Sequence, residues 1–198
     1  MRAARPADTA AVHRVCLLTA DAGGDASALH ADADLPGLVW ASPYLHAPGA
    51  VGVVVEDGDG VAGYCVGVPD TVGFEDWLES TWLPPLRRRR PPGSGRTPAD
   101  AALVDRLYHP PRTDPALLRT HPAHLHVDLL PRLQGRGWGR RVLETVCAAL
   151  ASAGAPGVHL GVDPANTGAR AFYDRLGFTA ADGGEQAHVL VRDLVTRR

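Results

Sequence analysis

The segment LLPRLQGRGWGRRVLETV, residues 129–146, joins an apolar strand pattern to an apolar-periodic helix pattern. Glycine stands at three alternate positions of this junction, Gly135, Gly137 and Gly139. A glycine-rich turn lets another group approach the main-chain N–H groups closely, and the N–H groups of a helix's first turn attract anions. The segment therefore predicts an anion-binding turn. Nearby arginines reinforce its positive charge: Arg132, Arg136, Arg140 and Arg141.

Two well-known nucleotide-binding turns do not fit this segment. A P-loop requires a Gly-Lys-Ser/Thr ending, whereas all 20 basic residues of this chain are arginine. A Rossmann turn requires the spacing G-x-G-x-x-G, whereas the glycines here follow G-x-G-x-G and come late in the chain. The spacing Gln134-x-x-Gly137-x-Gly139 is therefore a third pattern.

The sequence on either side of the turn predicts alternating strands and helices. Residues 124–131 alternate polar and apolar side chains, which predicts a strand with His124, His126 and Asp128 on one face. The segments that follow the turn predict, in order, a helix over 138–152, a strand over 157–163, a helix over 166–176 and a strand over 188–194. A strand, a turn, a helix and a second strand make a βαβ unit.

The N-terminal part of the chain predicts a helix and a hairpin. Residues 7–20 have helical apolar spacing behind a candidate cap, Asp8. Residues 21–48 predict a long connection with little regular structure. Residues 50–70 hold two strand patterns around the turn sequence EDGDG, and Asp-Gly turns favour a tight hairpin.

Residues 71–123 predict an insertion before the polar-faced strand rather than a second domain. Helical patterns cover 74–82 and 98–108, and we expect the run Arg87–Arg90 between them to be a solvated loop. A contact of this run with an acidic acceptor is a second interpretation. We therefore expect residues 1–198 to form a single domain, which is consistent with their number.

Composition limits the function classes. A formal net charge of −2 argues against a general nucleic-acid binder. Three separated cysteines in apolar segments predict reduced core thiols rather than a disulfide framework. We find no signal peptide pattern and no run of 18 apolar residues. We therefore expect a soluble cytoplasmic protein with no membrane partner, and heavy Ala, Gly, Pro and Arg use indicates a GC-rich, bacterial genome.

The glycine turn, with Pro131 before it, resembles the acyl-CoA pyrophosphate loop of the GNAT acetyltransferase superfamily. A second motif of that family, N-x-x-A-x-x-x-Y before a Leu-Gly-Phe turn, is matched in the right order by Asn166, Ala169, Tyr173 and the sequence Leu176-Gly177-Phe178. The resemblance covers nearly the whole chain. The residues EDGDGVAGYCVGVPDT, Trp77, Trp82-Leu83-Pro84 and HLHVDLLP also look like the acetyltransferase-like C-terminal domain of animal O-GlcNAcase.

The resemblance implies an α/β (α+β) GNAT fold, with a central mixed, mostly antiparallel sheet splayed at an acyl-CoA site and flanked by helices. It implies an N-acetyltransferase that moves acetyl from acetyl-CoA to an amine of a protein lysine, as in histone acetyltransferases, or of a small molecule. The residues that it implies for cofactor binding are Leu129, Leu130, Gln134, Gly135, Arg136, Gly137, Trp138, Gly139, Arg140, Arg141, Asn166, Ala169 and Tyr173.

The same resemblance implies roles in catalysis. A lysine-like amine, with a pKa of about 10.4, is mostly protonated at neutral pH and must lose a proton before it attacks. Asp128 is the first candidate for the proton acceptor, and His126 is the second. Tyr173 matches the position of the acid that protonates the departing CoA thiolate. A backbone N–H of Val127 or Leu129 is a candidate to stabilise the oxyanion.

Each of these residues has an alternative role. In these alternatives, Tyr173 is only an aromatic packing residue, Asp128 forms an ion pair with Arg132, and Asn166 only caps its helix. A metal held by His124, His126 and Asp128 is a weak alternative, and we expect none. Trp77 and Trp82 fit a core, a lid or the wall of an acceptor groove.

At the level of function, a CoA-binding regulatory or interaction module without turnover is the alternative to the enzyme. The sequence does not fix the acceptor, the acyl chain length or the oligomeric state, so a homodimer stays open.

Overall fold

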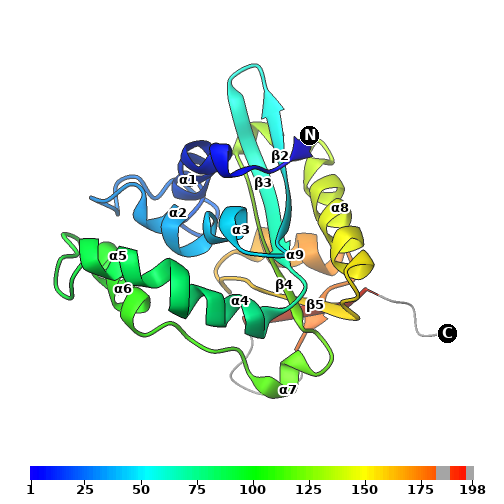
Figure 1. Ribbon diagram of the computed structural model, residues 1–198. Coiled ribbons are helices and arrows are strands. Elements are labelled where there is room, and N and C mark those ends of the chain that lie inside the picture. Colours follow the sequence, from blue (N-terminus) through cyan, green and yellow to red (C-terminus); the bar gives the residue numbers. More distant parts are fainter. Residues whose placement is uncertain (182–187, 195–198) are drawn as a thin grey trace.

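The computed structural model describes residues 1–181 and 188–194 (Figure 1). Its strands form one seven-stranded sheet in the order β1-β2-β3-β4-β5-β7-β6. The strands are β1 (Arg2–Ala3), β2 (Val51–Asp57), β3 (Gly60–Val68), β4 (Ala123–Leu129), β5 (Gly157–Gly161), β6 (Thr179–Ala180) and β7 (Val189–Asp193).

The sheet is antiparallel except between β4 and β5, which pair in parallel. These two strands pair at two positions, Ala123 with Val158 and His124 with His159. Beyond His124, residues 125–129 of β4 pair with β3 but not with β5. The predicted mixed, mostly antiparallel and splayed sheet is therefore confirmed, and the splay opens beside the polar-faced strand.

Helices cover both faces of the sheet. Figure 1 shows α8 on one face, with α1, α2 and α3 on the other and α4, α5 and α6 grouped beside them. The α-helices are α1 (Thr9–Leu17), α2 (Leu35–Trp40), α3 (Pro43–His46), α4 (Thr71–Trp77), α5 (Leu83–Arg89), α6 (Pro98–Tyr108), α7 (Pro115–Leu118), α8 (Trp138–Ser152) and α9 (Thr167–Asp174). Short helices η1 (Pro6–Asp8) and η3 (Pro131–Leu133) are of 3-10 type, and η2 (Leu78–Trp82) is a π-helical turn.

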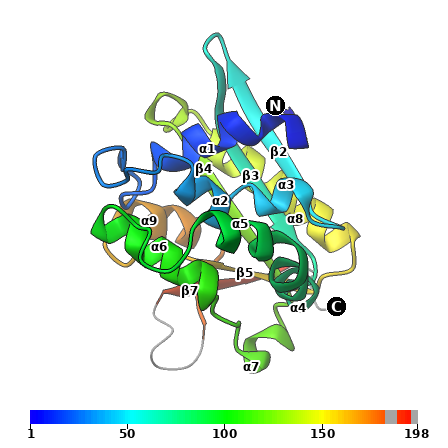
Figure 2. The same ribbon diagram turned by 60° about the vertical axis from the view of Figure 1, so that its left-hand side comes forward.

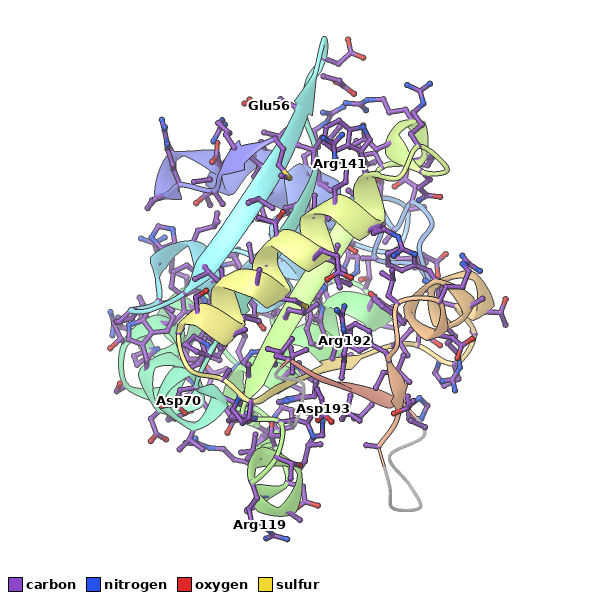
Figure 3. All side chains as sticks on the ribbon, turned by 90° about the vertical axis from the view of Figure 1, so that its right-hand side faces the viewer. Glu56, Asp70, Arg119, Arg141, Arg192 and Asp193 are labelled. Carbon is purple, nitrogen blue, oxygen red and sulfur yellow. The ribbon has the colours of Figure 1, made fainter. Side chains whose placement is uncertain are left out.

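Helix α8 carries the predicted apolar stripe. Val142, Leu143, Val146 and Leu150 are at most 1% exposed, and each buried aliphatic side chain contributes about 1.5–3 kcal/mol of transfer free energy. On its outer side Glu144 accepts two hydrogen bonds from Arg192 of β7. Figure 3 shows α8 lying across this face, with Arg141 at its N-terminal end and Arg192 beside it. The helix therefore holds the glycine turn in a fixed place relative to the sheet.

The predicted hairpin is confirmed. Strands β2 and β3 are joined at a tight turn in which Asp57 pairs with Gly60, and Gly60 has a φ of +99°. The predicted helices over 98–108 and 138–152 are also confirmed with those bounds. The three cysteines are buried and free, as expected.

Three local expectations are wrong. Residues 21–48 contain two short helices, α2 and α3, because apolar contacts bury Leu35 and Leu45 although the segment is rich in glycine and proline. Asp8 makes no side-chain cap on α1, since its carboxylate pairs with Arg2 and accepts the N–H of Arg5.

The third correction concerns the arginine run. The helix predicted over 74–82 extends through η2 into α5, so Arg87–Arg89 form the last turn of α5 rather than a loop. Arg87 pairs with Glu79 and Arg90 pairs with Asp32. Two residues of this run are therefore committed to internal ion pairs.

The insertion packs with α2 through a second hydrophobic cluster. Its buried members come from α2, α5 and α6: Leu35, Leu83, Leu86, Val104 and Leu107. Figure 2 shows these three helices lying together on the side of the sheet away from α8. This layer forms one wall of the larger cavity described below.

Candidate active site

The glycine turn has the conformation that the sequence predicts. Gly135 and Gly137 have φ values of +69° and +78°, a region that side-chain-bearing residues rarely adopt, and a Cβ at either would meet open space. Gly139 is needed for another reason. Its Cβ would lie 3.0 Å from the Phe172 ring, so the first turn of α8 approaches α9 where only glycine fits easily.

The turn presents a run of free donors. Arg141 N–H makes the first main-chain hydrogen bond of α8, to Gly137 O. No described residue accepts a hydrogen bond from the N–H groups of residues 135–140. Free N–H groups at the start of a 15-residue helix carry a partial positive charge. The geometry therefore suits a phosphate or pyrophosphate group.

A cavity of about 620 Å³ lies over this turn, and we call it the loop cavity. Its lining comes from the segment after α1, β4, the glycine turn with the first residues of α8, and α9 with its flanking residues. The predicted cofactor residues that line it are Leu129, Gln134, Gly135, Gly137, Gly139, Arg140, Asn166, Ala169 and Tyr173.

The other four predicted cofactor residues do not line the loop cavity. Leu130 is buried in the core, and its N–H donates to Ala62 O of β3. Trp138 packs against the core under the Arg141 guanidinium, which lies 4.7 Å from the centre of its ring. Arg136 is exposed. Arg136 and Arg141 therefore contribute positive charge near the turn without lining the cavity.

The polar face of β4 carries a hydrogen-bonded chain of three side chains. Tyr64 of β3, opposite Asp128 in the register, donates its hydroxyl to Asp128 Oδ2 at 2.5 Å. His126 Nδ1 lies 3.1 Å from the same hydroxyl oxygen. Because the tyrosine proton goes to the carboxylate, His126 Nδ1 is the donor to this hydroxyl oxygen. Asp128 Oδ1 has no hydrogen-bond partner among the described residues.

This arrangement excludes one alternative role of Asp128, the ion pair with Arg132. Asp128 does not pair with Arg132, which instead binds Asp57 of the hairpin. The carboxylate therefore stays available on the cavity side of the sheet. Tyr64, which is fully buried, was not predicted as a site residue, because its place opposite Asp128 depends on the register between two strands separated by the insertion.

The splay also exposes main-chain groups of β4. Leu130 N–H bonds Ala62 O across the antiparallel pair with β3, and hydrogen-bonded and non-bonded pairs alternate along such a ladder. Asp128 and His126 therefore direct their main-chain groups toward β3, while Val127 and Leu129 direct theirs toward the gap left by β5. Leu129 O in that gap accepts from Gln134 Nε2 at 3.0 Å.

Tyr173 of α9 lies at the inner end of the loop cavity. Its ring packs against Phe172 and Phe178, and the residue is 8% exposed. Burial raises the pKa of its hydroxyl well above the usual value, so the group stays protonated. Within the described ranges, the hydroxyl has no hydrogen-bond partner. The ring of Tyr173 therefore packs in the core, while its hydroxyl is available to donate a proton.

Asn166 fills the capping role that its sequence position predicts. Its Oδ1 accepts the N–H of Ala169 at 2.9 Å. The amide nitrogen points toward Gly23, where a Cβ would lie 3.2 Å away. Asn166 lines the loop cavity as well, so capping and ligand contact are compatible in this structure.

A second cavity, of about 710 Å³, adjoins the first, and we call it the aromatic cavity. Rings from α2, α3, α4 and η2 line it: Trp40, Tyr44, Phe74 and Trp82. Trp82 is therefore a wall residue, held by a hydrogen bond to Leu38 O, while Trp77 stacks behind it. The two cavities share lining residues, among them Val127, Asp128, Asn166 and Tyr173.

Two histidines at the start of the splay also line the aromatic cavity. His124 Nδ1 donates to Thr71 Oγ1, whose own proton goes to Pro122 O. His159 Nδ1 donates to His121 O at 2.8 Å. Burial lowers the pKa of His124 to about 3 and also lowers the pKa of His159. Both rings are therefore neutral at physiological pH.

In residues 1–181 and 188–194 there is no group of three or more His, Cys, Asp and Glu side chains arranged to hold a metal ion. None of the helices in those residues is long and apolar enough to cross a bilayer.

Comparisons with known proteins agree with this geometry. Residues 106–178 match the model of the acetyltransferase (GNAT) family. The crystal structure of SsHAT is 38% identical, with 97% of this chain and 96% of that chain covered and a TM-score of 0.82.

More distant structures share the fold. A GCN5-related N-acetyltransferase from Kribbella flavida is 17% identical, with 97% and 95% of the chains covered and a TM-score of 0.56. A putative acetyltransferase from Salmonella typhimurium, solved with its cofactor acetyl-CoA, is 18% identical, with 100% and 94% covered and a TM-score of 0.56.

Proposed function

Because this chain belongs to the GNAT acetyltransferase family, we propose that it transfers the acetyl group of acetyl-CoA to a primary amine, by direct attack of the amine on the thioester. One observation carries the proposal. The loop cavity and the aromatic cavity meet where Asp128 and Tyr173 line both. A donor bound on one side and an acceptor bound on the other would therefore meet beside a carboxylate and a protonated phenol.

Acetyl-CoA supplies an acyl group that is activated as a thioester, and the residues of the loop cavity fit its anionic part. The free N–H groups of residues 135–140 would hold the pyrophosphate, with Arg140 lining the same cavity. The main-chain groups of Val127 and Leu129 in the splay would hold the pantetheine chain, with Asn166 on the opposite wall. The cytoplasm, where acetyl-CoA is made and used, is the compartment that we propose.

Asp128 is the residue that we assign to remove the proton of the amine. Its Oδ2 accepts a hydrogen bond from Tyr64, whereas its Oδ1 has no partner in the described part of the chain. The bond to Oδ2 therefore fixes the carboxylate and leaves Oδ1 available. His126 reaches the same hydroxyl and, when its ring is neutral, provides a second acceptor at Nε2. General bases must lie within hydrogen-bond reach of the proton that they take, and both side chains line the cavity in which the amine would sit.

Tyr173 is the residue that we assign to protonate the departing thiolate. The raised pKa of its buried hydroxyl keeps the group protonated at neutral pH, so a proton is available when negative charge develops on the departing sulfur. The N–H of Val127, directed into the splay at the junction of the cavities, is placed to stabilise the oxyanion. Asp128 Oδ1 and the Tyr173 hydroxyl, which these roles use, have no hydrogen-bond partner within the described residues.

We propose that the acceptor amine belongs either to a protein lysine or to a small molecule. The aromatic cavity is large enough for a side chain or a metabolite, since pockets for small molecules span about 300–1,000 Å³. The likeness to the acetyltransferase-like domain of O-GlcNAcase stays a prediction. It does not by itself select either acceptor.

The missing lysines make the proposal straightforward to test. The chain has no lysine to label itself, so incubation with radioactive acetyl-CoA should place nearly all label in an added acceptor. We expect label in amine panels across pH 6 to 9. A panel that stays unlabelled while acetyl-CoA binds would identify a CoA-binding module without turnover.

The Asp128→Asn variant tests the assigned base. We expect kcat/KM for the amine to fall about 10- to 100-fold, with the largest loss at low pH, where a neutral amine is scarcest. Asp59→Asn, at the exposed hairpin tip, is the matched control and should leave the rate unchanged. An unaltered pH profile in Asp128→Asn would move the role of base to His126 or to water.

A further inference from the structure

Arg106 of α6 faces the aromatic cavity with no hydrogen-bond or ion-pair partner among the described residues. It lines that cavity, and its guanidinium carbon lies 4.1 Å from the centre of the Trp40 ring. Stacking covers one face of the guanidinium and leaves its N–H edge, with five donors, for another group. The side chain is therefore held in place but is not neutralised.

Neighbouring arginines of the same layer are paired. Arg87 binds Glu79, Arg90 binds Asp32, and Arg112 binds Asp76. Burial lowers the pKa of Arg106, whereas hydrogen bonds to carboxylates raise the pKa of Arg87 and of Arg112. Withdrawing a charge from water without a counter-charge destabilises the protein. Such a cost is offset when a ligand brings the opposite charge.

Tyr44 of α3 supplies a second donor on the same wall. Its ring stacks on Phe74, with centroids 4.6 Å apart, and its hydroxyl has no hydrogen-bond partner among the described residues. Burial raises the pKa of this hydroxyl, so that it stays protonated, and the charges of both Arg106 and Glu75 act on it. A guanidinium and a phenol thus face the cavity with unused donors.

Three acidic residues line the aromatic cavity, Glu75, Asp128 and Asp163, and none of them pairs with Arg106. Asp163 accepts the N–H of Ala165. Glu75 is occupied, since Oε1 accepts from the main chain and side chain of Thr113 and Oε2 pairs with Arg112. Asp128 lies at the junction with the loop cavity and is held by Tyr64. The cavity therefore contains a cation, on the wall that belongs to the insertion, which none of its three carboxylates binds.

We propose that Arg106 and Tyr44 bind a carboxylate of the acceptor, so that the enzyme acts on a primary amine that carries a carboxylate group. This specificity rests on the proposed acetyl transfer. The amine would lie beside Asp128 while the carboxylate lies on the guanidinium edge, and the aromatic rings between them would cover the connecting chain. A planar guanidinium suits a carboxylate because both of its oxygens accept parallel hydrogen bonds.

The first experiment compares acids with their neutral amides. Glycine, γ-aminobutyrate and ε-aminocaproate are offered as acceptors, each beside its primary amide, which keeps the amine and the chain length. We expect at least one acid to exceed its amide in kcat/KM by about 10- to 100-fold, the size of a charge-assisted hydrogen bond. In Arg106→Gln this preference should disappear, while the rate with the amide stays within about twofold.

Two variants separate recognition from folding. Tyr44→Phe removes one donor and keeps the ring, so the preference should fall about 3- to 10-fold. Arg88→Gln removes the same charge from the exposed end of α5, outside the cavity, and should change nothing. If Arg106→Gln fails to fold, Arg106→Lys retains the charge without the planar fork and should keep only part of the preference.

A binding measurement tests the same site without turnover. The N-acetylated acids and N-acetylated amides of the series are titrated into the wild-type protein and Arg106→Gln by calorimetry. Tighter binding of an acid that is lost in Arg106→Gln, without any acetyl transfer, would support the anion site and refute the proposed function. Transfer with equal kcat/KM for acids and amides, or equal binding of both forms, would overturn the anion site and leave the acetyltransferase in place.

Discussion

The loop cavity and the aromatic cavity are built in different ways. The anion-binding part of the loop cavity comes from one continuous segment, residues 129–141, and uses main-chain N–H groups that glycine leaves accessible. The aromatic cavity is lined by side chains from helices and strands as far apart in the sequence as Cys16 and Val189. Recognition by the main chain leaves a local pattern in the sequence, whereas a wall of assembled side chains does not.

The two cavities also differ in their charged groups. Positive charge in the loop cavity comes from N–H dipoles and exposed arginines, so it changes little with pH below the arginine pKa. The aromatic cavity contains the neutral His124 and His159 and three carboxylates, Glu75, Asp128 and Asp163. It also contains Arg106, which has no ion pair among the described residues. We therefore expect changes in the loop cavity to alter acetyl-CoA binding, and changes in the aromatic cavity to alter acceptor choice and pH dependence.

The junction of the cavities should give the largest effect. Tyr173→Phe removes a hydroxyl that has no hydrogen-bond partner in the described residues and keeps the ring that packs on Phe172 and Phe178. We expect kcat to fall about 10²- to 10⁴-fold, the usual contribution of general acid catalysis, with acetyl-CoA affinity and melting temperature nearly unchanged. Steady-state rates, calorimetry and thermal unfolding measure the three quantities.

Tyr108→Phe is the control for that variant, since its hydroxyl donates to Arg87 O outside both cavities. Its rate should match the wild type. If Tyr173→Phe also keeps the wild-type rate while chemistry is the slow step, Tyr173 serves as a packing residue, and the acid must be sought elsewhere at the junction.

The loop cavity should give the next effect. Gly137→Glu places a carboxylate against the free N–H groups at the start of α8, where the pyrophosphate would bind. Like-charge contact of this kind costs several kcal/mol, so we expect acetyl-CoA affinity to fall at least about 100-fold by calorimetry. The aromatic cavity should still bind the carboxylate probes in this variant.

Gly154→Glu is a matched control at the other end of α8. Gly154 also has a positive φ, +93°, and a Cβ there would meet open space, so the backbone strain of the substitution is similar. It should destabilise the protein as Gly137→Glu does but leave acetyl-CoA affinity intact. Equal loss of affinity in both variants would mean that strain, rather than the anion site, explains the result.

The sequence could predict those parts of the fold that depend on local pattern. The alternation of His124, His126 and Asp128, the Asp-Gly turn and the apolar stripe of α8 all have their cause within one element. The splay between β4 and β5 was also predicted, but from the family resemblance rather than from the spacing of residues. The helices over 35–46 were missed because burial against distant residues outweighs the low helix propensity of Gly37, and because Pro43 stands at the first position of α3, where proline is tolerated.

The parts of the site that could not be predicted depend on long-range placement. Tyr64 belongs to a strand that is buried almost throughout, and nothing local marks it as the partner of Asp128. Arg106 is one of 20 arginines, and only the packing of α6 against Trp40 distinguishes it. Side-chain sites built across an insertion therefore require the tertiary structure, and the pH behaviour of the aromatic cavity is one of their consequences.

That pH behaviour gives the smallest of the expected effects. His124 is neutral in the folded protein because burial, helped by His159 and His126, lowers its pKa to about 3, whereas in the unfolded chain its pKa is about 6.5. The unfolded state thus binds more protons between these values, so stability is complete above the unfolded pKa and is lost as the pH falls toward the folded one. We expect up to roughly 3 kcal/mol of unfolding free energy to be lost between pH 7 and pH 4 through this residue.

His124→Asn keeps a donor for Thr71 but does not titrate, so denaturant unfolding should show a smaller loss of stability in acid than in the wild type. His109→Asn, at a histidine whose side chain is 76% exposed, should keep the wild-type slope. An identical slope in His124→Asn would mean that His124 is solvated at low pH, and the aromatic cavity would then be as insensitive to pH as the loop cavity.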